Sequence, residues 1–299
     1  MIQKEDIEKS YKQLQNEICT GLEQLDGNGR FEEDIWDRPE GGGGRSRAIA
    51  NGELLEKGGV NFSAVHGDTP EKILKALNLN KADVFATGVS IVLHPTNPFV
   101  PIIHMNVRYF EMSNGVYWFG GGIDLTPHYI NDDDARFFHQ SLKSTCDRFD
   151  KSYYPKFKNW ADDYFFIPHR NETRGIGGIF FDRLNGQETG SKQNLLDFTL
   201  AVGRTFVPTY SELATRNRHK PFVDEDKKWQ YLRRGRYVEF NLVHDKGTKF
   251  GLDTGGRTES ILMSMPPIAN WQYNHTPQEG SAESETLKKL RKGVNWIDD

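Results

Sequence analysis

The sequence has few of the features that mark a membrane protein, a nucleic-acid binder or a disulfide-stabilised fold. Its longest largely apolar stretches, such as Val89–Leu93 and Ile261–Met265, are far shorter than the roughly 20 residues that a spanning helix needs. With 38 basic and 42 acidic residues the formal net charge is −4, whereas a protein that coats nucleic acid is usually strongly basic. Two cysteines, Cys19 and Cys146, are too few for a disulfide framework or a four-thiolate zinc site. We therefore expect reduced thiols, no integral membrane segment and no nucleic-acid partner.

Two further absences concern targeting and nucleotide binding. Residues 1–6 bring two acids early and no apolar signal run, so we expect a cytoplasmic protein. No G-x-G-x-x-G opens a helix and no G-x-x-x-x-G-K-[ST] occurs, which argues against a dinucleotide or ATP enzyme.

The chain nevertheless has enough apolar material for a large core. It is 299 residues long, and 36% of its residues are apolar. These include 19 Phe, 11 Tyr and 6 Trp, whose large side chains can fill a sizeable core. Internal repeats, low-complexity tails and linker-like segments are all lacking. We expect one domain over residues 1–299.

Hydrophobic periodicity predicts an α+β fold, an antiparallel sheet with helices packed on it. A helical face is formed, at steps of three and four, by Ile7, Tyr11, Leu14, Ile18, Leu22 and Leu25. Strands are expected at 84–93, 102–111 and 116–119, and Ser113-Asn114-Gly115 is a hairpin signal between the last two. Short strands are expected within 31–66, further strands at 177–184, 236–243 and 258–265, and helices at 131–165, 195–213, 224–234 and 282–292, with a brief one after Thr69-Pro70.

The first candidate site lies on the strand over 102–111. Side chains alternate between the two faces of a strand, so His104, Asn106 and Arg108 share one face. Ser90 and His94 likewise share a face of the preceding strand. Either this is a solvated outer face, or two strands present polar groups to a common binding cavity.

Acidic and basic residues beside glycine runs form the second group of candidates. Asp124 follows Gly120–Gly122, where the backbone can approach another group closely. Arg257 follows Gly255-Gly256 and could clamp a carboxylate, unless it pairs with Glu259. A strand over 236–243 would place on one face Tyr237, Glu239, Asn241, Val243 and Asp245. Several arginines, a few acids and aromatic walls suit an apolar ligand that bears carboxylates.

Four histidines, at positions 94, 104, 139 and 169, fall in otherwise structured segments. Imidazole is a common ligand of transition metals, so a metal site is conceivable. The spacing of these histidines does not match a pattern such as H-E-x-x-H.

Several longer motifs resemble those of the oxygen-dependent coproporphyrinogen III oxidases. The resemblance runs from about Ile7 to the C-terminus, with the motifs in the same order. The motifs are His94–Pro98, His104–Phe110, Trp118–Pro127, His169–Glu172 with Arg174–Gly178, Arg236–Leu242 and Gly255–Leu262.

The resemblance implies a reaction and an assembly. Members of this family convert coproporphyrinogen III to protoporphyrinogen IX in haem biosynthesis, turning two propionates into vinyl groups with O₂ and releasing CO₂ and hydrogen peroxide. They form homodimers, their fold is a large antiparallel sheet sandwiched between layers of helices, and they use no flavin, haem or nicotinamide.

The resemblance also implies roles for individual residues. His104 corresponds to the proton donor, and Asp124 and Asp245 to acids that handle pyrrole or propionate protons. Substrate contacts correspond to Ser90, Asn106, Val107, Arg108, Gly255, Gly256 and Arg257. The dimer-forming region corresponds to residues 237–272. A divalent metal has been suggested for bacterial relatives at positions matching His94, His104, His139 and His169. Lys246 stands where some relatives have arginine, which keeps the charge and loses the bidentate fork.

The sequence leaves two other functions open. A metal-dependent hydrolase would gather the four histidines around one ion. A non-catalytic tetrapyrrole carrier would use the same arginines without producing peroxide or CO₂.

Overall fold

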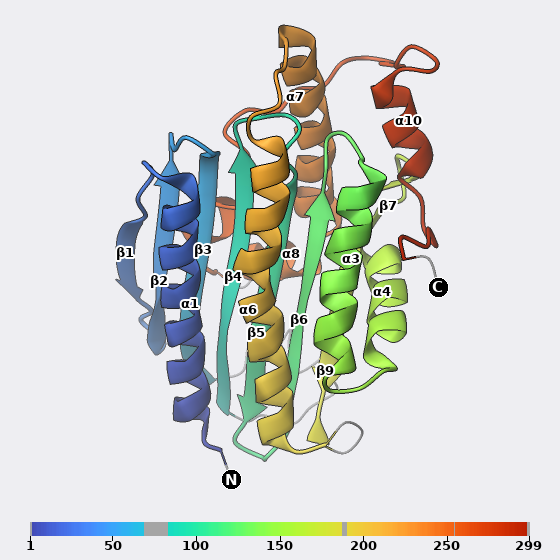
Figure 1. The fold of residues 1–299 in the computed structure, drawn as a ribbon. Helices are drawn as coiled ribbons and strands as arrows, with labels where there is room; N and C mark the ends of the chain where they lie inside the picture. Colours follow the sequence, from blue (N-terminus) through green and yellow to red (C-terminus); the bar gives the residue numbers. More distant parts are fainter. Residues whose placement is uncertain (1, 69–82, 187–189, 254, 298–299) are drawn as a thin grey trace.

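One seven-stranded antiparallel sheet organises the molecule (Figure 1). The computed structural model describes residues 2–68, 83–186, 190–253 and 255–297. In order across the sheet the strands are β1 (Glu32–Asp37), β2 (Gly42–Ala50), β3 (Leu55–Asp68), β4 (Asp83–Pro95), β5 (Ile102–Met112), β6 (Tyr117–Thr126) and β9 (Gly178–Leu184). A separate two-stranded ribbon pairs β7 (Phe166–Ile167) with β8 (Glu172–Thr173). The first six large strands follow one another as a meander, and β9 joins the edge after two helices.

Four helices cover one face of the sheet, as Figure 1 shows. They are α1 (Lys4–Asp26), α3 (Asp132–Asp147), α4 (Tyr153–Tyr164) and α6 (Lys192–Asn217). Cross-strand rows such as Val60, Ile91, Met105 and Ile123 are buried beneath them. Alternate residues of the same strands point to the opposite face, so one sheet carries an apolar face under helices and a more polar face.

The remaining helices come from the C-terminal third. They are α7 (Asp224–Glu239), the π-helix η1 (Phe240–His244), α8 (Lys246–Asp253), α9 (Thr258–Leu262) and α10 (Ala282–Lys289). Figure 1 shows α8 behind the sheet, on the side away from α1 and α6. The residue after α9, Met263, lies so close to Gly59 of β3 that an added Cβ would come within 2.2 Å of its methyl group. The segment after α9 therefore packs on the polar face of the sheet.

The expected α+β fold is confirmed, and the helix over Ile7–Leu25, the hairpin at 113–115 and the strands over 84–119 are among the confirmed elements. The brief helix expected after Thr69-Pro70 lies outside the described residues. No helix within the described ranges is both long and apolar enough to cross a bilayer.

Two expected strands are wrong. Residues 236–243 continue α7 into η1, because Tyr237 and Phe240, three apart, are both buried at helical spacing. Residues 258–265 contain α9 instead of a strand. The carbonyls that follow α9 accept hydrogen bonds from side chains, His94 to Ser264 and Lys57 to Met265, and so need no strand partner.

Candidate active site

The polar residues expected to share a face do so, because the strand register places them side by side. Asn106 lies opposite Ser90, and His104 lies opposite Asp124. Arg108 lies opposite Gly120 on the same side of the sheet. The face opposite α1 and α6 thus carries a histidine, an acid and an arginine on two adjacent strands.

The hairpin turn sets the contact between His104 and Asp124. Both residues are ten positions from Asn114, the centre of the turn, and they form a cross-strand pair. The Nδ1 atom of His104 lies 2.7 Å from Oδ1 of Asp124. The pairing of His104 with Asp124 could therefore have been predicted from the hairpin signal at 113–115, by counting ten residues outward from the turn on each strand.

Arg174 completes this group and was not assigned a role from the sequence. Asp124 is only 1% exposed, and its two carboxylate oxygens each lie 2.7 Å from Nη2 of Arg174. Nη1 of Arg174 donates to the Asn241 side chain at 2.8 Å. Burial opposes ionisation of Asp124, but the Arg174 guanidinium and the hydrogen bond from His104 hold its pKa below the usual range. An arginine that opens a glycine-rich segment between apolar flanks is the sequence signal for such a buried partner.

Arg108 is a partly exposed charged group of this face. Its side chain is 44% exposed, and its Nη2 donates to Asp182 at 2.9 Å, which leaves other N–H groups available to a ligand. A Cβ at Gly120 would lie 2.5 Å from the Asp182 carboxylate, so glycine leaves the space that this pair occupies. Ser90 is exposed, whereas the side chain of Val107 is buried on the helix-covered face.

Arg257 lies where α9 begins and contacts a different strand. Its guanidinium forms an ion pair with Asp34 of β1 and donates to Ser260 Oγ at 3.2 Å. Gly255 adopts a left-handed conformation with φ +72°, and the Gly256 N–H donates to a carbonyl of α8. The glycines therefore turn the chain from α8 to α9. The alternative pairing of Arg257 with Glu259 is not the one found.

Asp245 follows the π-helix and is engaged on both carboxylate oxygens. Oδ1 accepts from the Tyr164 hydroxyl at 2.8 Å, and Oδ2 accepts from the backbone and hydroxyl of Thr248. Burial, with the Asp245 charge beside it, raises the pKa of Tyr164. Asp245 thus begins α8 and fixes a tyrosine of α4. It does not lie on a strand face.

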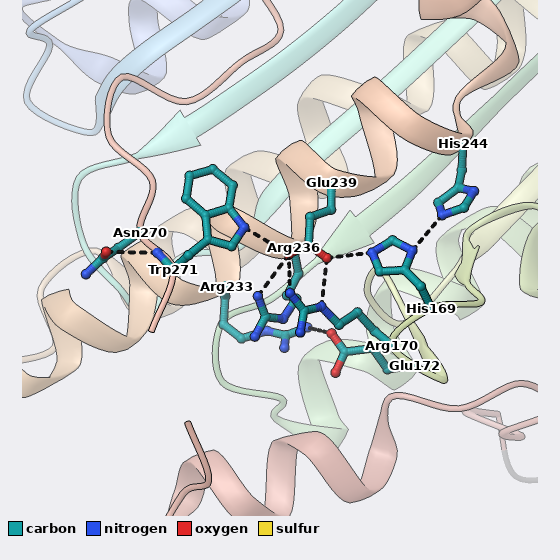
Figure 2. A network of polar contacts seen from close by, with 9 residues as sticks. All are labelled: His169, Arg170, Glu172, Arg233, Arg236, Glu239, His244, Asn270 and Trp271. Atoms are coloured by element: carbon teal, nitrogen blue, oxygen red, sulfur yellow. Dashed lines mark hydrogen bonds and ion pairs between the residues drawn. The ribbon is translucent and has the colours of Figure 1, made fainter. Parts of the chain in front are cut away.

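Glu239, expected on the same strand face, is instead the centre of a polar network (Figure 2). Its carboxylate accepts two bonds from Arg170 and one each from His169, Arg236 and Trp271. Burial opposes ionisation, but the hydrogen bonds from Arg170, His169 and Trp271 lower the pKa of Glu239 to about 2. This network connects the end of α7 to the turn between β7 and β8.

The four candidate metal ligands are not brought together. His94 donates to a carbonyl after α9, and both ring nitrogens of His139 are used by Tyr154 and the Ile176 carbonyl. Burial lowers the pKa of both His94 and His139 to about 3. His104 contacts Asp124, and His169 contacts Glu239 and His244. Over the described part of the chain, no group of three or more His, Cys, Asp or Glu could hold a metal ion. These histidines do not fit a shared divalent metal.

Comparison with known proteins identifies the family. The sequence matches the coproporphyrinogen III oxidase family over residues 6–296. The chain belongs to this family. It is 46% identical to an oxygen-dependent coproporphyrinogen-III oxidase of Prochlorococcus marinus (strain NATL1A), across 96% of this chain and 89% of the relative. It is 47% identical to a chloroplastic oxygen-dependent coproporphyrinogen-III oxidase of Glycine max, across 97% of this chain and 79% of the relative.

Membership of the coproporphyrinogen III oxidase family confirms the resemblance stated from the motifs. In this member, the motifs on β4, β5 and β6 supply the polar face with His104 and Arg108. The later motifs supply Arg174, which reaches Asp124, and Arg257 at α9. Segments far apart in the sequence therefore contribute to one side of the sheet.

Proposed function

We propose that this chain catalyses the oxygen-dependent conversion of coproporphyrinogen III to protoporphyrinogen IX in haem biosynthesis. In each of two steps a propionate side chain and O₂ become a vinyl group, CO₂ and hydrogen peroxide. The propionate loses one hydrogen from the carbon next to the ring and loses its carboxylate as CO₂. O₂ takes up the two electrons and two protons. The substrate is itself the reductant, so this balance needs no separate electron carrier.

The observation that carries this proposal is the polar face itself. The motifs of a family matched over residues 6–296 meet on one side of the sheet, where helices leave His104, Ser90 and Arg108 partly or fully accessible. A macrocycle fringed by carboxylates needs cationic groups at its edge and a proton-transferring group near the reacting carbon.

His104 is the group best placed to move a proton. Its Nδ1 is held by Asp124, so Nε2 is the nitrogen left to interact with the substrate. Asp124 is too deeply buried to reach the substrate directly, and its role is to orient His104. Asp245 is the acid proposed to handle a proton, acting beside Tyr164.

Arg108 and Arg257 are proposed to hold propionates. Each has one carboxylate partner within the chain, Asp182 and Asp34, and each guanidinium keeps further N–H donors for a ligand. Ser90, Asn106 and the backbone of Gly255 and Gly256 are proposed as neighbouring substrate contacts. The core position of Val107 leaves only its backbone for such a contact.

The test uses chelator-treated protein and coproporphyrinogen III, first without air and then with air. We expect vinyl product only after air is admitted, with one CO₂ and one peroxide for each vinyl. Product formed equally well without O₂ would overturn the proposal. Binding without peroxide or CO₂ would indicate a carrier. Activity that is lost on chelation and restored by a metal would indicate metal-dependent chemistry.

We also propose that the protein is a homodimer, formed through residues 237–272 of its single domain. Six large apolar side chains in this segment are between 41% and 53% exposed: Leu242, Val243, Phe250, Leu252, Ile268 and Trp271. Apolar side chains gathered on one segment of a surface are typical of a protein interface. A second copy of the chain would remove them from water.

Light scattering after gel filtration tests the dimer. We expect twice the chain mass of 34.3 kDa for the wild type and a monomer for a Val243→Arg, Phe250→Arg double variant. Phe149→Arg, which changes another exposed aromatic outside this segment, should stay dimeric. A monomeric wild type would contradict the proposal.

Cytoplasmic location is proposed from the thiols. Cys19 and Cys146 are both buried and free, and burial raises their pKa to about 11 and about 12. Such thiols suit a reducing compartment. Fractionation of the host cell should place the protein in the cytoplasm.

A further inference from the structure

Arg174 lies between β8 and β9 with its guanidinium enclosed on every side. It is 2% exposed and contacts both oxygens of Asp124 and the side chain of Asn241. Its guanidinium carbon lies 4.4–4.8 Å from the centres of three aromatic rings, those of Phe165, Tyr237 and Phe240. A cation surrounded in this way does not reach the substrate. Its closest contact in the site is Asp124, at 2.7 Å, and its Nη2 also lies 3.5 Å from Nδ1 of His104, so any influence on catalysis acts through these two side chains.

We propose that Arg174 is a positioning residue that determines which ring nitrogen of His104 carries the proton. The inference rests on the proposed function, in which His104 moves a proton. Paired with Arg174, Asp124 stays ionised and can only accept a hydrogen bond. Nδ1 of His104 lies 2.7 Å from this carboxylate and 3.5 Å from Nη2 of Arg174, and the much shorter contact with an acceptor requires Nδ1 to be the N–H donor. Nε2 is then the nitrogen that can exchange a proton with the substrate.

Without Arg174 the same geometry would allow the opposite arrangement. A carboxylate buried without a cation takes up a proton instead of staying charged. The resulting O–H of Asp124 could donate to Nδ1 of His104, and the ring proton would move to Nε2. The charge of Arg174 thus determines the tautomer of His104 through the protonation of Asp124.

Two segments keep the guanidinium in this position. The residues after Arg174 pack directly on the backbone of β6: a Cβ at Gly175 would lie 2.1 Å from the Leu125 carbonyl, and Ile176 N donates to that carbonyl at 3.0 Å. On the other side, η1 supplies Asn241 as acceptor and Phe240 as a ring. Single π-helical turns are rare and frequently occur at functional sites. Both supports hold Arg174 beside Asp124.

The direct test reads the tautomer without substrate. In full-length protein labelled with ¹⁵N-histidine, long-range ¹H–¹⁵N spectra report which ring nitrogen is protonated, and the His104 signal is assigned by its loss in His104→Gln. We expect an Nδ1–H ring in the wild type and in Arg174→Lys, which keeps the cation. We expect a shift toward Nε2–H in Arg174→Gln. An unchanged Nδ1–H ring in Arg174→Gln would overturn the inference.

Kinetics provide the second readout. In Arg174→Gln, kcat should fall about 100-fold or more while KM changes less than threefold, because general acid–base catalysis typically contributes that much. Its activity should partly recover at higher pH, as Asp124 ionises again. Arg233→Gln is the matched control: Arg233 is equally buried and paired with Glu172, outside this group. Arg233→Gln should keep the wild-type His104 tautomer and pH profile. If it changed them as Arg174→Gln does, the effect would not be specific to Arg174.

The double variant Arg174→Gln, Asp124→Asn keeps the inference testable if Arg174→Gln fails to fold, because it buries no unpaired charge. We expect it to fold, to lose the Nδ1–H preference and to have turnover as low as Asp124→Asn. A folded double variant with the wild-type tautomer and turnover would overturn the inference. A third outcome separates the two proposals. If the tautomer shifts in Arg174→Gln as expected but the wild-type protein makes no vinyl product, the proposed function is refuted and the inference about Arg174 stands.

Discussion

Removing Glu56 should destabilise the protein more than removing its partner Arg234. Arg234 is fully buried, and its Nη2 donates to the Glu56 carboxylate at 2.6 Å and to the Pro95 carbonyl at 3.0 Å. The Glu56 side chain is 22% exposed and also lies 4.0 Å from Lys227. In Glu56→Ala the buried guanidinium loses its carboxylate and keeps the neutral Pro95 carbonyl and the Tyr231 ring, whose centre lies 5.7 Å from the guanidinium carbon. In Arg234→Met the carboxylate keeps water and a lysine, and Pro95 keeps a bond from Gln230.

The magnitude follows from these environments. Leaving one member of a buried ion pair without its partner costs about 3–5 kcal/mol. For a chain of 299 residues the unfolding entropy is about 0.6 kcal/mol per kelvin, so Glu56→Ala should lower Tm by about 5–8 °C. Arg234→Met should lower the free energy of unfolding by about 1 kcal/mol or less, because replacing a buried charge by an apolar group of similar volume is often nearly neutral.

Urea and thermal unfolding at pH 7, followed by circular dichroism, measure these differences. The double variant Glu56→Ala, Arg234→Met should be more stable than Glu56→Ala, since it buries no unpaired cation. Glu225→Ala, which removes an exposed carboxylate from an i,i+3 pair with Lys228, should stay within about 0.5 kcal/mol of the wild type. The reasoning is refuted if Glu56→Ala costs less than about 1 kcal/mol, or if the double variant is as unstable as Glu56→Ala.

Three further predictions concern other carboxylates and the proposed site. The Asp26 carboxylate accepts hydrogen bonds from four backbone N–H groups at 2.7–3.0 Å, two on each oxygen. Asp26→Asn replaces one of these oxygens by an NH₂ donor and should lower the free energy of unfolding, measured in urea, by about 4 kcal/mol. A decrease of less than about 1 kcal/mol would contradict this. The pKa of Glu239 is lowered from 4.5 to about 2 in the folded protein, so its contribution to stability is complete above about pH 4.5 and is lost as the pH falls toward 2. In Glu239→Gln the free energy of unfolding should therefore depend less steeply on pH between 4.5 and 2. An unchanged pH dependence would contradict this. Arg257→Ala should raise KM about tenfold or more and lower kcat/KM, whereas Arg204→Ala, which breaks an exposed pair, should not; unchanged kinetics would remove Arg257 from the site.

Strand periodicity predicted much of the sheet because alternation over ten residues is a local property. The polar and apolar faces of 102–111 were both correct, since each side chain's face depends only on its position along the strand. The segments 236–243 and 258–265 were wrong because eight residues fit both periods. Contacts with distant residues then decided the outcome, such as Phe240 against Phe165 and His94 with the Ser264 carbonyl.

The candidate site was predictable only where strands are linked by a short turn. His104 and Asp124 meet because the turn between them is short and symmetric. Arg174 reaches Asp124 from 50 residues further along the chain, and Asn241 contacts Arg174 from 67 residues beyond that. Periodicity carries no information about such contacts, because they depend on how the loop before β9 and η1 pack against the finished sheet.

The symmetric hairpin around Asn114 also indicates where the chain can be lengthened. One residue added within either strand between the turn and the His104–Asp124 pair would send a side chain of that pair to the wrong side of the sheet. Residues 113–115 are exposed, and a Cβ at Gly115 would meet no atom within 4 Å, so a longer turn has room. At about 3.4 Å per residue this tip is roughly 30 Å from the pair. A dye or affinity peptide inserted there would report on the enzyme while leaving its chemistry undisturbed.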